Sequence, residues 1–116
     1  MLRATIAAIV LSSTTSPASA EGPDIYTGNG LYRVCSEESP GFQSGLCHGF
    51  IAGVIARSSL AERIVPKSGL ICDVSRAENG QIRDVIVAYL RDHPADRHYA
   101  SSQLIVQALQ AAFCTK

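Results

Sequence analysis

Apolar residues recur with helical spacing along most of the second half of the chain. Between residues 79 and 93 they fall three or four positions apart, as on one face of a helix: Ile82, Val85, Ile86, Tyr89 and Leu90. Pro94 cannot continue a helix, so this one is expected to end near His93. A further apolar face is expected on a helix that opens at residues 99–101 and ends near Phe113: Leu104, Ile105, Ala108, Leu109, Ala112 and Phe113.

The first half predicts two more helices. A short helix is expected to begin after a cap at Thr27 or Asn29 and to end near Cys35. After a polar loop, a longer helix is expected from about Phe42 to about Ala61, with a long polar connection from residue 62 to 79 behind it. No segment alternates with a period of two. The chain therefore predicts an all-α fold, a compact bundle of four main helices.

A stripe of glycines marks the second predicted helix. Gly45, Gly49 and Gly53 recur at every fourth position, and each costs about 1 kcal/mol relative to alanine inside a helix. We interpret the stripe as a seam where another helix approaches closely. Packing within the fold is the favoured form of that seam, and the contact of a homodimer is the alternative.

The first twenty residues have the three parts of a secretory signal peptide. Arg3 supplies a positive charge, residues 4–11 are apolar, and Ala18-Ser19-Ala20 forms a small-residue cleavage site. The apolar run is under half of the roughly 20 residues that a membrane span needs. We therefore expect residues 1–20 to be removed. Residues 21–116 would then form a helical domain in the periplasm that is not held in the membrane.

Four cysteines follow the expected cleavage site. An even number in a short exported chain predicts two disulfides, and the sequence alone permits three pairings. We favour Cys35–Cys47, which closes a short loop between the first two helices. The other favoured bridge, Cys72–Cys114, ties the segment before the third helix to the C-terminus.

Other chemistries fit the sequence poorly. The cysteine spacings match no zinc template, although His48 adjoins Cys47 and His93 lies near His98. Neighbouring helix residues point about 100° apart, and a paired cysteine is no nucleophile, which disfavours a Cys–His catalytic pair. With 10 basic and 10 acidic side chains, the chain lacks the charge of a nucleic-acid binder. We expect no enzymatic activity, no cofactor, no metal and no nucleic-acid partner.

Five short segments follow one another along the chain: TGN at 27–29, CHGFIAGV at 47–54, YLRDHP at 89–94, RH at 97–98 and AAFC at 111–114. In this order they resemble the Rap/Tai immunity family of bacterial type VI secretion systems. The resemblance implies a periplasmic, disulfide-bonded helical protein, often dimeric, that binds a peptidoglycan amidase effector. Such an inhibitor inserts a protruding loop into the groove that holds the Cys–His pair of the enzyme. Val74 and Glu78 depart from the family pattern, which usually has Pro and Thr there.

These departures direct attention to the connection at 58–79. We expect partner-specific contacts there through Arg63, Lys67 and Arg76, with three merely solvated cations as the alternative. The segment 93–98 is interpreted as a structural corner rather than an inhibitory tip. In it His93 would face the negative end of the third helix, and Asp96 or Arg97 would satisfy backbone groups. The alternative function is a periplasmic binding or acid-stress chaperone-like module without a toxin partner.

Overall fold

The computed structural model describes residues 24–37, 41–68 and 71–114. In these ranges the chain forms the helices α1 (Gly28–Cys35), α2 (Phe42–Ile64), α3 (Asn79–Asp92) and α4 (Ser101–Leu109). A 3₁₀ turn at Pro94–Asp96 joins α3 to α4, and a π-helical turn at Gln110–Cys114 follows α4. The described ranges contain no strand, so the predicted all-α bundle of four main helices is confirmed. The predicted signal peptide, residues 1–20, lies outside the described residues.

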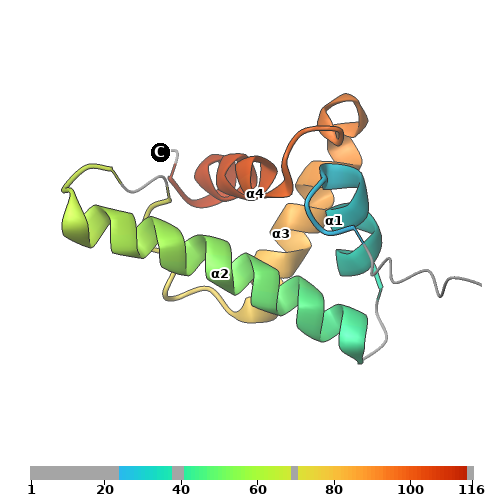
Figure 1. Ribbon diagram of the computed structural model, residues 1–116, viewed down its shortest axis with the longest axis horizontal. Coiled ribbons are helices and arrows are strands. Elements are labelled where there is room, and N and C mark those ends of the chain that lie inside the picture. Colours follow the sequence, from blue (N-terminus) through green and yellow to red (C-terminus); the bar gives the residue numbers. More distant parts are fainter. Residues whose placement is uncertain (1–23, 38–40, 69–70, 115–116) are drawn as a thin grey trace, which may run out of the picture.

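The long helix α2 lies along one side of the molecule, and α1, α3 and α4 pack against it and against one another (Figure 1). The largest fully buried side chains come from these three helices and from the bridge between α1 and α2: Leu31, Ile86, Leu90, Leu104, Ile105, Leu109, Val34, Cys35 and Cys47. In contrast, the buried residues of the 23-residue α2 are Cys47, Ile51 and Ser58. Most of the surface of α2 therefore faces away from the core.

The interpretation of the glycine stripe as a packing seam within the fold is wrong. A β-carbon added to Gly45, Gly49 or Gly53 would meet no described atom within 4 Å, because these glycines lie on the uncovered side of α2. The close approach occurs in α1 instead, where a β-carbon on Gly30 would lie 1.5 Å from the carbonyl oxygen of Asp24. The predicted homodimer contact stays a prediction.

The ends of two helices also differ from expectation. α2 continues past Ala61 to Ile64, and the first residue in extended conformation is Val65, which precedes a proline and is therefore kept out of helical geometry. After α4 the wider π-helical turn changes the register of the apolar face. Ala112, expected to be buried, is exposed for that reason, whereas Phe113 is half-buried.

The predicted cap of α1 at Thr27 is confirmed. The Thr27 hydroxyl accepts a hydrogen bond from the Gly30 N–H (3.2 Å) and donates one to the Asp24 carboxylate (2.9 Å). The Tyr26 N–H and the Thr27 hydroxyl donate to Asp24 and hold the pKa of its carboxyl below 3.8. This charge therefore stabilises the fold above the ordinary pKa, and its contribution is lost as the pH falls through the lowered one.

The corner between α3 and α4 is organised by Arg97. Its side chain donates to the carbonyl oxygens of Leu90 (2.6 Å) and Arg91 (3.3 Å), which the end of α3 leaves without helical partners. The guanidinium carbon also lies 4.2 Å from the ring centroid of Tyr32 in α1. Arg97 thus joins α3 to α1.

The backbone of the same corner supports the start of α1. The Asn29 N–H donates to the Arg97 carbonyl (2.8 Å), and the Gly28 N–H donates to the Tyr99 carbonyl (3.0 Å). His93 Nδ1 lies 2.7 Å from the carbonyl oxygen of Tyr89 in the last turns of α3. The interpretation of this segment as a structural corner is confirmed for His93 and Arg97, and its contacts explain why the TGN segment begins α1.

Replacing Arg97 by Ala is expected to lower the free energy of unfolding by about 2–3 kcal/mol. A part-buried hydrogen bond to the Leu90 carbonyl, an exposed one to the Arg91 carbonyl and the cation–π contact are lost together. Urea denaturation followed by circular dichroism measures the loss. The control is Arg91→Ala, which removes an exposed pair with Asp92 and is expected to cost under about 0.5 kcal/mol. Equal effects of the two substitutions would contradict the role given to Arg97.

Candidate functional site

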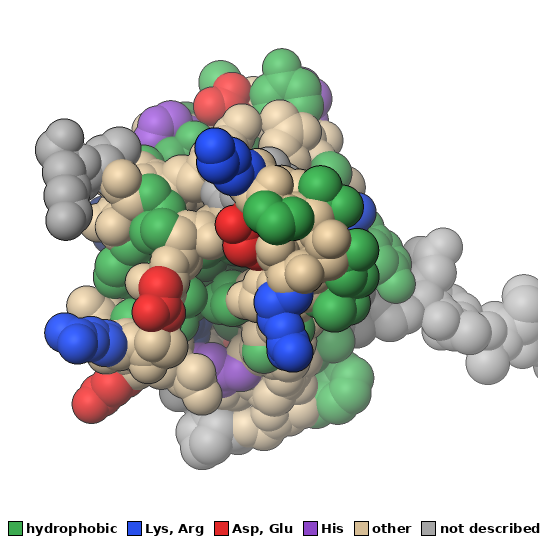
Figure 2. Space-filling view, turned by 90° about the vertical axis from the view of Figure 1, so that its left-hand side faces the viewer, with side chains coloured by type: hydrophobic (Ala, Val, Ile, Leu, Met, Phe, Trp, Pro, Cys, Tyr) green, Lys and Arg blue, Asp and Glu red, His purple; other side chains and the backbone are tan. Residues whose placement is uncertain are grey.

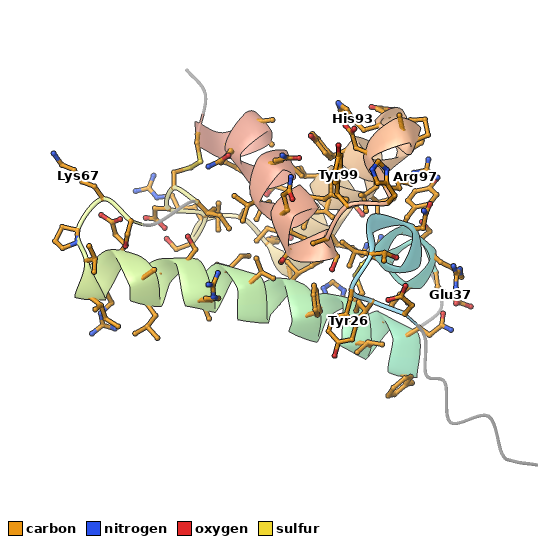
Figure 3. All side chains as sticks on the ribbon, turned by 45° about the horizontal axis from the view of Figure 1, so that its top comes forward. Tyr26, Glu37, Lys67, His93, Arg97 and Tyr99 are labelled. Carbon is orange, nitrogen blue, oxygen red and sulfur yellow. A yellow bond between two sulfur atoms is a disulfide. The ribbon has the colours of Figure 1, made fainter. Side chains whose placement is uncertain are left out.

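The candidate site begins at a turn that projects from the end of α2. Val65, Pro66 and Lys67 are exposed in this turn. Figure 3 places Lys67 at one end of the molecule and the labelled corner residues His93 and Arg97 at the other. We call residues 65–68 the tip.

Hydrogen bonds to α2 fix the conformation of the tip. The Lys67 N–H donates to a carboxylate oxygen of Glu62 (3.0 Å), and the Ser68 hydroxyl donates to the carbonyl oxygen of Ala61 (2.7 Å). Lys67 has a φ of 67°, in the left-handed region that reverses the chain tightly. The tip is therefore an ordered turn that exposes the side chains of Val65, Pro66 and Lys67, whereas Ser68 turns back toward α2.

Beyond the tip, the connection at 71–78 is anchored to the rest of the fold. The Ile71 N–H donates to the hydroxyl of Ser58 (3.0 Å), which is buried in α2. Val74 is only 8% exposed and belongs to the core, and the Cys72–Cys114 bridge holds the connection to the C-terminus. Val74, where the family usually has proline, thus acts as an apolar anchor. At the other departure, Glu78 precedes α3 without a side-chain cap.

A groove of about 580 Å³ lies between α2 and the connection. We call it the connection groove. Its lining combines apolar side chains with charges of both signs: His48, Ile51, Ala52, Ile55, Ala56, Ser59, Glu62, Arg63, Ile71, Cys72, Asp73, Val74, Ser75, Ala77, Asn79 and Ile82. The Ser75 N–H donates to Asp73 (2.9 Å), which lowers the pKa of that carboxyl, and the charge of Arg76 lowers it further.

A groove of about 710 Å³ lies on the other side of α2, against α4. We call it the α4 groove. Among its described lining residues the charged side chain is Arg57, and Leu60 and Ile64 at its edge are 55% and 69% exposed. Polar residues of α4 and of the turn after it complete the groove: Ser102, Gln103, Gln107 and Gln110. Sequence reasoning missed this groove. The available signal was the apolar pair Leu60 and Ile64, four residues apart on a face with no described cover.

The three predicted partner-binding cations are all exposed, and they lie on or beside the tip and the connection groove. Arg63 lines the connection groove, and Lys67 lies on the tip. Arg76 is exposed and lies between Ser75 and Ala77, which both line the connection groove. Figure 2 looks onto the end of the molecule that carries the tip and shows Lys and Arg side chains interspersed with acidic and apolar ones. Their part in binding stays a proposal.

The cysteines are all oxidised, in the favoured pairing: Cys35–Cys47 and Cys72–Cys114. Within the described ranges, no three or more His, Cys, Asp or Glu side chains gather in a way that could hold a metal ion. In the same ranges no helix has the length and apolar character to cross a bilayer. What this site offers is an ordered projecting turn flanked by two grooves of mixed apolar and polar lining, which are elements of a protein-binding surface.

Comparison with known families gives a match. The sequence model of the Rap1a immunity proteins matches residues 27–114, from the cap of α1 to the last disulfide cysteine. No curated protein and no solved structure matches the chain. Immunity proteins inhibit a cognate effector rather than act as enzymes, and this family is typically periplasmic. Because the match spans most of the chain and both bridges, the chain belongs to the Rap1a immunity protein family.

Proposed function

We propose that this protein is exported to the periplasm, where it protects the cell by binding a peptidoglycan amidase effector of a type VI secretion system. Membership of an immunity family supports the binding of an effector. The observation that supports blockage of a groove is the tip, because it is exposed and yet fixed by hydrogen bonds to α2. An ordered loop loses little conformational freedom on binding, which favours affinity.

In this proposal the tip enters the active-site groove of the amidase and excludes the peptidoglycan substrate. Val65 supplies apolar contact, and Lys67 supplies a positive charge at one end of the molecule. The α4 groove and the connection groove flank the tip and receive the rims of the enzyme groove. Arg63 and Arg76 contact the effector from the connection side. Inhibition of this kind needs shape and charge complementarity and no bond-making step.

A protection assay in cells tests the proposal. A candidate peptidoglycan amidase effector is directed to the periplasm, where its hydrolysis of the cell wall lyses the host. Coexpression of the full chain is expected to restore growth. The same chain without residues 2–20 is expected to stay in the cytoplasm and give no protection, which controls for the compartment. Lysis at an unchanged rate in the presence of the full chain would contradict the proposal.

Neutralising the three cations is expected to weaken effector binding with little effect on the fold. The triple variant R63Q/K67Q/R76Q removes three contacts at the edge of the interface, each worth about 0.5–1 kcal/mol, which predicts a rise in Kd of about ten- to hundredfold. Calorimetric titration against the amidase measures the Kd. Arg33→Gln, on an exposed position of α1 remote from the tip, is the matched control and is expected to leave the Kd unchanged. An unchanged Kd for the triple variant would remove these cations from the interface.

A further inference from the structure

The two disulfides lie in opposite surroundings. Cys35 and Cys47 are each 1% exposed and belong to the core between α1 and α2. Cys72 is exposed, and Cys114 is half-buried in the last turn of the described chain. Thiol–disulfide exchange requires a thiolate to reach one sulfur of the bridge, so exposed bridges are the ones that open in a folded protein. The two disulfides therefore differ in how easily a thiolate can reach their sulfur atoms.

A hydrogen bond also distinguishes the two sulfurs of the exposed bridge. The backbone N–H of Cys72 donates to Sγ of Cys114 at 3.1 Å. When the S–S bond breaks, this N–H stabilises negative charge on the Cys114 sulfur, and a better-stabilised thiolate leaves faster. Cys72 is the more exposed partner. The geometry thus favours attack at Cys72 with departure of Cys114.

We propose that Cys72–Cys114 is a redox-labile bridge that a dithiol reductant opens in the folded protein, and that its opening releases the wall of the connection groove. A thiolate of the reductant bonds to Sγ of Cys72, and the electron pair of the S–S bond passes to Sγ of Cys114, which then takes a proton. The second thiol of the reductant attacks the mixed disulfide and frees Cys72 as a thiol. Two electrons and two protons move from the dithiol to the cysteine pair, and the dithiol becomes a disulfide.

The effect of opening the bridge depends on the other contacts that hold the connection at 71–78 to the fold. Cys72 lines the connection groove, and the bridge is the covalent link from this wall to the turn after α4. After reduction the contacts that remain include the hydrogen bond from the Ile71 N–H to Ser58 and the burial of Val74. Such local contacts open far more often than the core does. The wall of the connection groove is therefore expected to loosen, while α1, α3 and the buried side of α2 keep their packing.

The experiment uses the purified, fully oxidised protein alone. It is exposed to dithiothreitol for graded times without denaturant, quenched with N-ethylmaleimide and mapped by mass spectrometry. Cys72 and Cys114 are expected to be labelled at least about tenfold faster than Cys35 and Cys47, because access to the buried bridge requires opening of the core. Equal rates, or faster labelling of the buried pair, would overturn the proposal.

Two further measurements complete the test. With glutathione, a monothiol, the adduct is expected on Cys72 with Cys114 free, and an adduct mainly on Cys114 would overturn the direction of attack.

In the selectively reduced protein, amide hydrogen exchange is expected to accelerate at Ile71 and not in α1, and unchanged exchange at Ile71 would overturn release of the wall. The C72A/C114A variant, in which the connection is expected to exchange as fast as in the reduced protein, is the matched control. Because the amidase takes no part, failure here leaves the proposed function standing, and failure of the protection assay leaves this inference standing.

Discussion

Replacing Gly30 by Ala is expected to lower the free energy of unfolding by about 2–4 kcal/mol, the cost of forcing a methyl group into a packed contact. A β-carbon there would lie 1.5 Å from the carbonyl oxygen of Asp24, and this neighbour is backbone that cannot rotate away. The segment at 24–27, which leads into α1, must shift. The shift breaks the cap in which the Thr27 hydroxyl links the Gly30 N–H to the Asp24 carboxylate.

The matched control is the same substitution in the exposed stripe of α2. Gly49→Ala adds a methyl group where no described atom lies within 4 Å, and alanine has the higher helix propensity. It is expected to raise the free energy of unfolding by about 0.5–1 kcal/mol. Urea denaturation of the two variants therefore gives midpoints on opposite sides of the unsubstituted protein. A stable Gly30→Ala variant, or a destabilised Gly49→Ala variant, would contradict the packing described for these helices.

The second large effect is expected from the buried bridge. Removing it in the C35A/C47A variant is expected to lower the free energy of unfolding by about 4–5 kcal/mol. About 3 kcal/mol is chain entropy of the closed loop, and about 1–2 kcal/mol is loss of buried sulfur contacts. Both cysteines are 1% exposed and join α1 to α2, so their removal weakens the contact between these helices. Thermal and urea unfolding measure the loss.

A comparison of serine with alanine separates burial from cross-linking. At positions 35 and 47 serine buries a hydroxyl, so C35S/C47S is expected to be less stable than C35A/C47A by about 1–3 kcal/mol. At the exposed Cys72 and the half-buried Cys114 the serine and alanine variants are expected to be nearly equal. The same serine penalty at both bridges would show that they do not differ in burial as described.

Features whose cause is local in the chain are those that the sequence predicted well. Pro94 ends α3, Thr27 caps α1, and α3 has the predicted apolar face, because a proline ring, a hydroxyl and a repeat of side chains act within a few residues. Contacts between segments that are distant in the sequence were harder to predict. A glycine in a helix has the same propensity cost whether another segment approaches it or none does, so Gly49 looked like a seam and Gly30 did not.

In the candidate site, too, the features that depend on the whole fold were not predicted from the sequence. The cations Arg63, Lys67 and Arg76 were predicted as partner contacts because the connection departs from the family pattern, and their role stays a prediction. The α4 groove was missed because it depends on which side of α2 the other helices cover, and that is decided by the whole bundle. The extension of α2 to Ile64 also moved the projecting turn, so the tip could be located only in the folded structure.

The most direct test of groove blockage is the reactivity of the catalytic cysteine of the amidase. Purified amidase is treated with iodoacetamide alone and with an equimolar amount of the oxidised protein, and alkylation of that cysteine is followed by mass spectrometry. The account predicts that alkylation and peptidoglycan hydrolysis fall together as the protein is added, to near zero at one tip per active site. A complex that forms while the cysteine stays fully reactive, or no complex at all, would contradict it.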